Sequence, residues 1–331
     1  MKALVYTAPE QLAFRDMPDP APSEDEELVE IEASGICGSD MHAFLGHDER
    51  RPAPLILGHE AAGTIASGPR AGERVVINPL VTCGRCWACR QGRSNLCESR
   101  EIISMPPRAG AFARYVSMPR QNLIAVPETV SSEQAALTEP LACGWHAVRL
   151  AGAMLVEPWP AVTALVLGGG AIGLGAALAL KDRGAERVWI SEPNAQRRDG
   201  IEATGRFETF DPLSKDLPDA ASFDLVIDAV GLAATRAAAC RFARPGGAIV
   251  HIGLAEGTGG LDVRRMTLQE ISFVGTYTYT DADFRDTAAA LFAGRLGMLD
   301  WVDIRPLSDG LRAFEDLRDG RVAAPKILLR P

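Results

Sequence analysis

Four of the chain's seven cysteines lie between residues 83 and 97, in the spacing C-x2-C-x2-C-x7-C. Four thiolates so spaced can surround one Zn²⁺ in tetrahedral geometry, and such a closed site stabilises a lobe without taking part in a reaction. A redox function of the CxxC pairs is the alternative, but the βαβ context of redox motifs is missing here. The expected structural zinc ligands are Cys83, Cys86, Cys89 and Cys97.

A second set of metal donors is scattered along the sequence. Cys37 lies in GICGSDMH, His59 and Glu60 lie in GHEAAG, and Glu139 lies in TEPLACGWHA. A thiolate, an imidazole and one of the two carboxylates would provide the mixed ligation of a catalytic zinc with one position left open. Each residue alone is equally typical of a core or a surface, so these residues predict a site only if the fold brings them together.

A glycine-rich turn follows the apolar run LVL and precedes an Ala-rich helical segment. This context favours a dinucleotide-binding loop over a simple turn, because the glycines permit close approach of a pyrophosphate to the helix N-terminus. Glu192, about 20 residues further on, can accept hydrogen bonds from the ribose of NAD. Arg197 and Arg198 follow it and would suit the 2′-phosphate of NADP, which stays the alternative. The expected loop residues are Gly168, Gly170, Ala171, Ile172 and Gly173.

The elements around these motifs indicate two domains. Before residue 140 short alternating strands and turns predict a β-rich domain. After residue 277 come two helices, the second capped by Ser308 and closed by Gly320, and the strand KILL; this tail is too small for its own core and should return to the first domain. The domains are therefore residues 1–141 with 277–331, and 142–276. Six apolar runs predict the parallel strands of a doubly wound α/β domain, at 165–167, 187–191, 207–210, 225–230, 248–254 and 271–275.

Composition excludes some partners. The 331 residues carry a net charge of −9, which offers no broad basic surface to nucleic acid or to an anionic membrane. Residues 161–180 are uncharged over the length of a membrane span, but three glycines divide them into a strand and a helix. The N-terminus lacks the apolar core of a signal peptide. We therefore expect a cytoplasmic protein whose thiols stay reduced.

The ordered motifs GxCGSDxH, GHExxG, CxxCxxCx7C, EPLA, GGGxIG and KILL resemble the zinc-dependent medium-chain dehydrogenase/reductases, in the branch of sorbitol, threonine and butanediol dehydrogenases. The resemblance extends over nearly the whole chain. It implies a GroES-like catalytic domain joined to a Rossmann domain, with one catalytic and one structural zinc per chain. It also implies oxidation of a secondary alcohol or polyol with hydride transfer to NAD, and a homo-oligomer, either a tetramer or a dimer.

The resemblance further implies roles for single residues. Cys37 and His59 match catalytic zinc ligands, and either Glu60 or Glu139 matches the third. Asp40 is expected to orient His59, Ser39 to contact the substrate hydroxyl, and His42 to pass its proton to solvent. The nicotinamide ring is expected near Val230, Ile252 and Gly253. A catalytically silent relative and an NADP-dependent aldehyde or ketone reductase are the alternatives.

Overall fold

The computed structural model describes all 331 residues, which form two compact units. The first unit comprises Met1–Pro140 and Thr280–Pro331, and the second comprises Leu141–Tyr279. The predicted fold class, a Rossmann-type parallel sheet with a β-rich domain, is confirmed.

The first unit is built mainly from short strands. Its largest sheet has the order β10-β6-β5-β3-β18-β17, with β9 paired to β3, and smaller sheets have the orders β2-β1-β4 and β7-β8. The strands are β1 Lys2–Ala8, β2 Gln11–Asp16, β3 Glu26–Gly35, β4 Leu55–Ile56, β5 Glu60–Ile65, β6 Arg74–Ile77, β7 Leu80–Val81, β8 Glu101–Ile102, β9 Tyr115–Pro119, β10 Leu123–Ala125, β17 Val302–Pro306 and β18 Lys326–Arg330.

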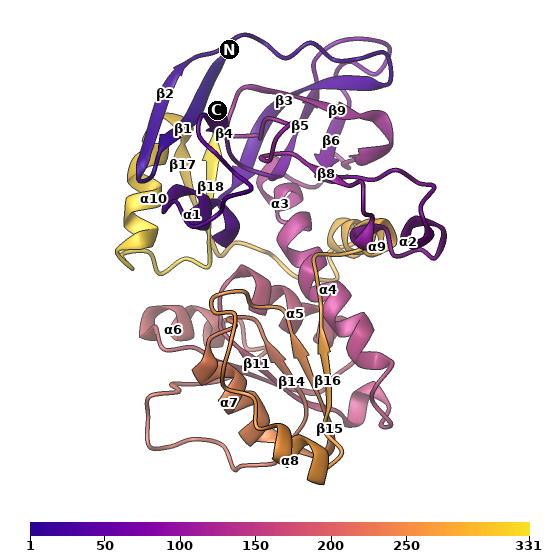
Figure 1. Ribbon diagram of the computed structural model, residues 1–331, viewed down its shortest axis with the longest axis vertical. Coiled ribbons are helices and arrows are strands. Elements are labelled where there is room, and N and C mark those ends of the chain that lie inside the picture. Colours follow the sequence, from indigo (N-terminus) through magenta and orange to yellow (C-terminus); the bar gives the residue numbers. More distant parts are fainter. The chain divides into compact units, whose positions relative to one another are not determined.

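The C-terminal segment returns to the first unit, as the small tail predicts. β18 pairs with β3 through Leu328 opposite Gly35, and Figure 1 shows β17 and β18 beside the N-terminal strands. The helices of this unit are α1 Gly38–Phe44, α2 Trp87–Arg90, α3 Ser132–Ala136, α9 Asp281–Phe292 and α10 Gly310–Arg318, with 3-10 turns η1 Ser94–Leu96, η2 Arg120–Asn122 and η4 Leu307–Asp309; α4 Thr138–Gly152 continues into the second unit.

The predicted cap of α10 is wrong. Ser308 lies inside the 3-10 turn η4, and Asp309 occupies the N-cap position instead. The 3-10 turn shifts the helix start by one residue, which a sequence pattern does not reveal. Gly320 follows the helix with φ of 68°, a conformation that favours glycine at a helix end.

The amphipathic helix α10 packs its apolar side onto the N-terminal strands. Phe314 lies 5.1 Å from the Phe44 ring and 5.9 Å from the Phe112 ring, measured between ring centroids. All three rings are fully buried. Aromatic contacts of this kind add to the hydrophobic stabilisation, so they fix α1, which carries part of the candidate site, against the C-terminal segment.

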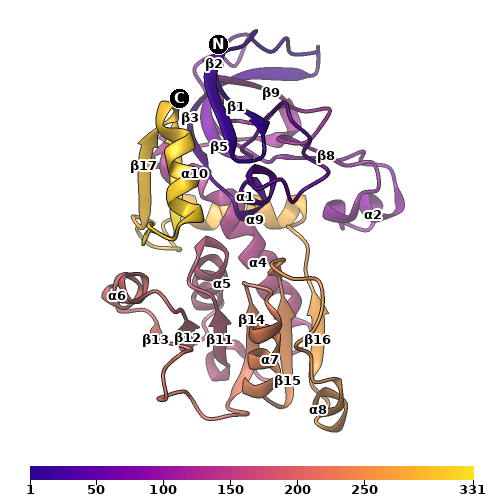
Figure 2. The ribbon, with the colours of Figure 1, turned by 60° about the vertical axis from the view of Figure 1, so that its left-hand side comes forward.

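The second unit is a parallel six-stranded sheet with the order β13-β12-β11-β14-β15-β16. Figure 2 shows α6 beside the β13 edge and α8 beside the β16 edge. Its strands are β11 Thr163–Leu167, β12 Arg187–Ser191, β13 Glu208–Phe210, β14 Phe223–Asp228, β15 Ala243–His251 and β16 Ser272–Gly275. Its helices are α5 Ala171–Asp182, α6 Ala195–Ala203, α7 Ala233–Phe242 and α8 Val263–Leu268, with the 3-10 turn η3 Trp159–Ala161.

The uncharged segment 161–180 is divided between strand β11 and helix α5, as its glycines predict. None of the helices combines the length and the apolar character that crossing a membrane requires.

Candidate active site

The first candidate metal site lies where β3 ends and β5 begins. These strands are antiparallel neighbours, and their register places Gly35 opposite Glu60. Cys37 follows β3 as the N-cap of α1, and His59 directly precedes β5. The donor atoms of Cys37, His59 and Glu60 consequently lie within 4.8 Å of one another. The sheet register thus joins two motifs that are more than twenty residues apart.

The Glu60 carboxylate has one oxygen bound and one without a partner. Its Oε1 accepts a hydrogen bond from Lys326 Nζ at 2.7 Å. Its Oε2 is buried without a hydrogen bond. A buried oxygen with no partner costs free energy, and a bound cation would offset that cost. A thiolate, an imidazole and this carboxylate oxygen are donors that Zn²⁺ accepts, so the residues fit a catalytic zinc.

The His59 ring is oriented by two groups on its Nδ1 side. Asp40 Oδ1 lies 3.4 Å and Ser104 Oγ lies 3.3 Å from Nδ1. On the opposite side, Ser39 Oγ lies 3.4 Å from Nε2. With Nδ1 engaged, Nε2 is the nitrogen left to ligate a metal, and Ser39 stands beside that position.

Asp40 is fully buried and satisfied by several donors. Its Oδ2 accepts a hydrogen bond from the Cys37 N–H at 3.0 Å, and its Oδ1 accepts one from the Gly58 N–H at 3.1 Å. Burial would raise the pKa of Asp40, but the charges of His59 and Arg51 and these hydrogen bonds outweigh it and lower the pKa. Asp40 therefore stays ionised beside His59, as an orienting carboxylate must.

Lys326 is a buried cation next to the donor cluster. Its Nζ donates to the Ile36 carbonyl at 2.9 Å as well as to Glu60. Burial would lower the pKa of Lys326, but the nearby charges of Glu60, Cys37 and Glu139 outweigh it and raise the pKa. The ammonium therefore fixes the direction of the Glu60 carboxylate.

Glu139 and His42 lie outside the cluster of three donors. Glu139 is buried in the first turn of α4, but it does not belong to the group within 4.8 Å. The geometry therefore favours Glu60 as the third donor. His42 lies in α1 and is exposed to solvent, three residues beyond Ser39.

The four clustered cysteines form the second group of donors. Cys83, Cys86, Cys89 and Cys97 have their sulfur atoms within 4.8 Å of one another. Backbone N–H groups of Arg85 and Cys86 lower the pKa of Cys83 to about 6, which favours the thiolate that a metal binds, whereas burial and the neighbouring thiols raise the pKa of Cys89 to about 12. All seven cysteines are free thiols. The lobe therefore has the chemistry and the closed geometry of a structural zinc site.

The glycine loop in the second unit lies between β11 and α5. Gly168 adopts φ of 100°, and a Cβ at Gly173 would lie 1.8 Å from the Gly168 carbonyl oxygen. Only glycine fits at these two positions. Gly170 is the N-cap of α5, with Ala171 and Ile172 in its first turn. The unpaired N–H groups of this helix start are a suitable place for a pyrophosphate.

Glu192 follows β12 next to this loop and is 4% exposed. Its Oε2 accepts a hydrogen bond from the Gly169 N–H, and its Oε1 accepts one from the Asn194 N–H, both at 2.9 Å. Arg197 lies 3.5 Å from Oε2, and Arg198 donates to the Glu192 carbonyl at 2.7 Å. The carboxylate is thus fixed beside the glycine loop, with two cations close to it.

The three residues expected beside the nicotinamide lie at the carboxyl ends of adjacent strands. Val230 follows β14, while Ile252 and Gly253 follow β15. A Cβ at Gly253 would lie 2.0 Å from the Val230 carbonyl carbon, so the two segments touch through their backbones.

Two family models match the chain: "Alcohol dehydrogenase GroES-like domain" over residues 23–128 and "Zinc-binding dehydrogenase" over residues 171–294. The L-galactonate-5-dehydrogenase of Escherichia coli (strain K12) is 31% identical over 89% of this chain and 88% of that protein. The sorbitol dehydrogenase of Bacillus subtilis (strain 168) is 31% identical over 85% of this chain and 83% of that protein.

A solved zinc-binding dehydrogenase from Sinorhizobium meliloti 1021, bound to NADP, has a TM-score of 0.88 at 28% identity, covering 100% of this chain and 99% of that one. This structure, the two matched domain models and the two relatives together show to which family the chain belongs. The chain is a zinc-dependent medium-chain dehydrogenase.

Sequence reasoning missed two residues of the dehydrogenase's candidate site. In the sequence, Lys326 is noted only as the first residue of the predicted strand KILL, and Ser104 lies in a loop that contains no motif. Ser104 adopts φ of 69°, and its carbonyl accepts a hydrogen bond from Arg51 Nε at 3.0 Å. A lysine in an otherwise apolar buried strand is the one signal that could have indicated Lys326.

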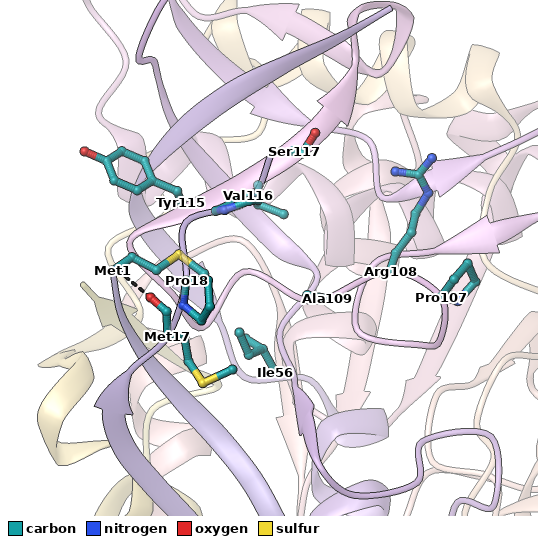
Figure 3. A pocket seen from close by; sticks show the side chains of 11 residues that line it. Met1, Met17, Pro18, Ile56, Pro107, Arg108, Ala109, Tyr115, Val116 and Ser117 are labelled. Atoms are coloured by element: carbon teal, nitrogen blue, oxygen red, sulfur yellow. Dashed lines mark hydrogen bonds between the residues drawn. The ribbon is translucent and has the colours of Figure 1, made fainter. Parts of the chain in front are cut away.

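The dehydrogenase also has an apolar pocket of about 310 Å³ in its first unit. Figure 3 shows Met1, Met17, Pro18 and Ile56 around it. Neither group of metal donors contributes to its lining. The pocket thus lacks the chemistry of the candidate active site.

Proposed function

We propose that this dehydrogenase oxidises a secondary alcohol of a polyol or sugar alcohol to the ketone, with NAD as the hydride acceptor. The meeting of Cys37, His59 and Glu60, with one buried Glu60 oxygen left unpaired, is the observation that supports this most strongly. A bound zinc lowers the pKa of a coordinated alcohol, and the nicotinamide accepts the hydride.

The chain's own residues hold the reactants and move the proton. Cys37, His59 and Glu60 would hold the catalytic zinc and leave a position for the alcohol. The Ser39 hydroxyl, next to His59 Nε2, is placed to accept the proton of the alcohol. Exposed His42 would relay that proton to solvent. Asp40 holds the His59 ring in the ligating orientation.

We infer that the cofactor is NAD, bound along the carboxyl ends of the Rossmann strands. The pyrophosphate would lie at the start of α5, and the adenosine ribose would hydrogen-bond to Glu192. A buried carboxylate there repels a 2′-phosphate. Arg197 and Arg198 supply the opposite charge, so NADP is the second candidate.

We further propose a structural zinc bound by the four cysteines of residues 83–97, which makes two zinc ions per chain. The seven free thiols fit the reducing conditions of a cytoplasmic protein.

We propose that two copies pair along β16, the edge strand of the six-stranded sheet. Phe273 on this strand is 37% exposed, and Val263 and Leu268 on the adjoining helix α8 are more exposed still. An uncovered apolar edge strand is a template for pairing across a two-fold axis, as in a dimer or within a tetramer. Light scattering should show an oligomer, and Phe273→Lys should reduce its size; a monomeric wild type would refute this.

One assay tests the proposed reaction. The purified protein, with its zinc content measured, is incubated with polyols, vicinal diols, aldoses or threonine and with NAD or NADP, and the absorbance of the reduced cofactor is followed. We expect turnover of at least one secondary alcohol with NAD, and a loss of turnover of roughly 100-fold or more in Ser39→Ala. Full zinc content without turnover of any alcohol would favour a catalytically silent relative. A preference for NADP would favour the reductase alternative.

A further inference from the structure

Arg236, in helix α7, is a buried cation that none of the sites described above uses. Its side chain is 6% exposed, and its carboxylate neighbour, Glu256 Oε2, is 4.0 Å away. It donates instead to backbone carbonyls. Nε donates to Gly259 at 2.6 Å, Nη1 donates to Gly231 at 2.8 Å and to Glu256 at 2.9 Å, and Nη2 donates to Thr258. A buried guanidinium bound in this way fixes the course of the backbone around it.

The backbone that Arg236 holds belongs to two loops at the carboxyl edge of the sheet. Gly231 lies in the loop after β14, while Glu256, Thr258 and Gly259 lie in the loop after β15. Residues 254–259 of the second loop are all exposed, so packing contributes little to its position. Arg236, itself buried in the second turn of α7, joins this exposed loop to the buried Gly231 before the helix.

Glu256 joins the same two loops by a second route. Its Oε2 accepts a hydrogen bond from the Ala233 N–H at 2.7 Å, and its own N–H donates to the Gly231 carbonyl at 2.9 Å. A Cβ at Gly260 would lie 2.1 Å from the Ala233 carbonyl oxygen, so the loop also packs directly onto the helix start. The contacts with α7 therefore specify one conformation of residues 253–260.

These loops lie on the half of the sheet that the nicotinamide would occupy. The strand order reverses between β11 and β14, which is where a dinucleotide crosses the edge of such a sheet. The pyrophosphate site at α5 and the ribose site at Glu192 belong to the β11–β12 half. The other half of the cofactor must therefore extend over β14 and β15, past Val230 and Ile252.

We infer that Arg236 is a positioning residue for the nicotinamide half of the cofactor. By joining the loops after β14 and β15, it keeps the wall formed by Val230, Ile252 and Gly253 in its binding conformation. This inference rests on the proposed cofactor site. Without the guanidinium the carbonyls of Glu256, Thr258 and Gly259 lose their donor, and the Gly231 carbonyl keeps only the Glu256 N–H. The loop after β15 then exchanges between conformations, and the affinity for the nicotinamide falls with the populated fraction of the binding conformation.

The experiment compares two ligands that share the adenosine and pyrophosphate groups. NADH carries the nicotinamide, and ADP-ribose does not. Isothermal titration of each ligand into the whole enzyme gives the ratio of the two affinities. We expect Arg236→Met to weaken NADH by roughly tenfold or more while ADP-ribose changes by less than about twofold. Arg236→Lys keeps the charge but not the planar fork, so its effect on NADH should be intermediate.

The matched control is Arg265→Met. Arg265 also donates to backbone carbonyls of the same unit, those of Cys240 and Ala243, but at the start of β15 and not at its carboxyl end. Its loss should lower the melting temperature without changing the ratio of the NADH and ADP-ribose affinities. Arg236 variants, in contrast, should change the ratio of the NADH and ADP-ribose affinities, even when they lower the melting temperature no more than Arg265→Met does.

The outcomes separate this inference from the proposed function. Equal weakening of both ligands, or an unchanged NADH affinity, would refute a positioning role for Arg236. If Arg236→Met does not fold, an unchanged affinity ratio in Arg236→Lys would refute it as well. A wild type that binds neither ligand would refute the proposed cofactor site itself, before any variant is compared.

Discussion

Replacing Gly35 with alanine should displace the catalytic zinc. A Cβ added at Gly35 would lie 2.0 Å from Glu60 Oε2, the buried carboxylate oxygen that has no hydrogen-bond partner. The backbone of Gly35 has no positive φ, so the carboxylate is the obstacle to alanine at this position. The carboxylate cannot turn away freely, because Lys326 holds its other oxygen at 2.7 Å.

The size of the effect follows from the distance. Cβ contacts below 3.0 Å essentially do not occur, so Oε2 must retreat from 2.0 Å by about 1 Å. Zinc–ligand distances tolerate only about 0.2 Å, so Glu60 would leave the coordination sphere. Mutation of residues that only orient the metal ligands lowers metal affinity by roughly 10- to 100-fold. Loss of a ligand should cost at least about 100-fold, or ~2.7 kcal/mol.

The assay is zinc content after dialysis against a competing chelator. The wild type should keep two zinc ions per chain, and Gly35→Ala should keep one, with turnover reduced in parallel. The control is Gly38→Ala, because a Cβ at Gly38 meets nothing within 4 Å and Gly38 begins the same helix α1. Two retained zinc ions and normal turnover in Gly35→Ala would show that Glu60 is not a ligand.

Two further predictions concern the other sites, and a third concerns the stability of the first unit. Cys97→Ser should lower zinc content by one equivalent and lower the melting temperature, because its sulfur completes the closed cluster; normal melting with full zinc would refute the structural site. Glu192→Ala should weaken NAD by ~1 to 3 kcal/mol and shift the kcat/KM ratio toward NADP, whereas an unchanged ratio would show that Glu192 does not contact the ribose. Burial would raise the pKa of Glu26, but hydrogen bonds from Arg108 and Ser117 lower it to about 2. The ionised form therefore stabilises the fold above the unfolded pKa of about 4.3, and the stabilisation disappears as the pH falls toward 2. Glu26→Gln should cost about 1 kcal/mol at neutral pH and little at pH 2, measured by chemical unfolding across the pH range; an equal cost at both pH values would contradict this.

The fold elements that the sequence predicted correctly are local patterns. The six parallel strands are short apolar runs between turns, which indicate a sheet buried on both faces. The four cysteines meet because their spacing alone brings them together. Cys37, His59 and Glu60 meet because their motifs stand at the ends of two paired strands, although strand pairing itself could not be read from the residues.

The residues that the sequence did not predict depend on long-range contacts. Lys326 meets Glu60 across 266 positions of the chain, through the pairing of the last strand with β3. Ser104 reaches His59 from a loop that has no periodic pattern. Arg236 acts on backbone carbonyls, which carry no signal in side-chain types. Single polar residues of this kind become recognisable only when their buried partners are known.

The charges of the candidate catalytic site explain why Asp40 and Lys326 accompany the proposed zinc ligands. Among the proposed ligands and the two side chains that hold them, a ligating Cys37 thiolate, Glu60 and Asp40 would contribute three negative charges and Lys326 one positive charge, which leaves −2. A divalent ion balances this sum. Without the divalent ion, bound protons must balance the negative charge. Burial lowers the pKa of His59, but the interactions with Asp40 and Cys37 outweigh burial and raise this pKa well above its usual range. Protons and zinc therefore compete for the same ring, so the affinity for zinc must weaken as the pH falls.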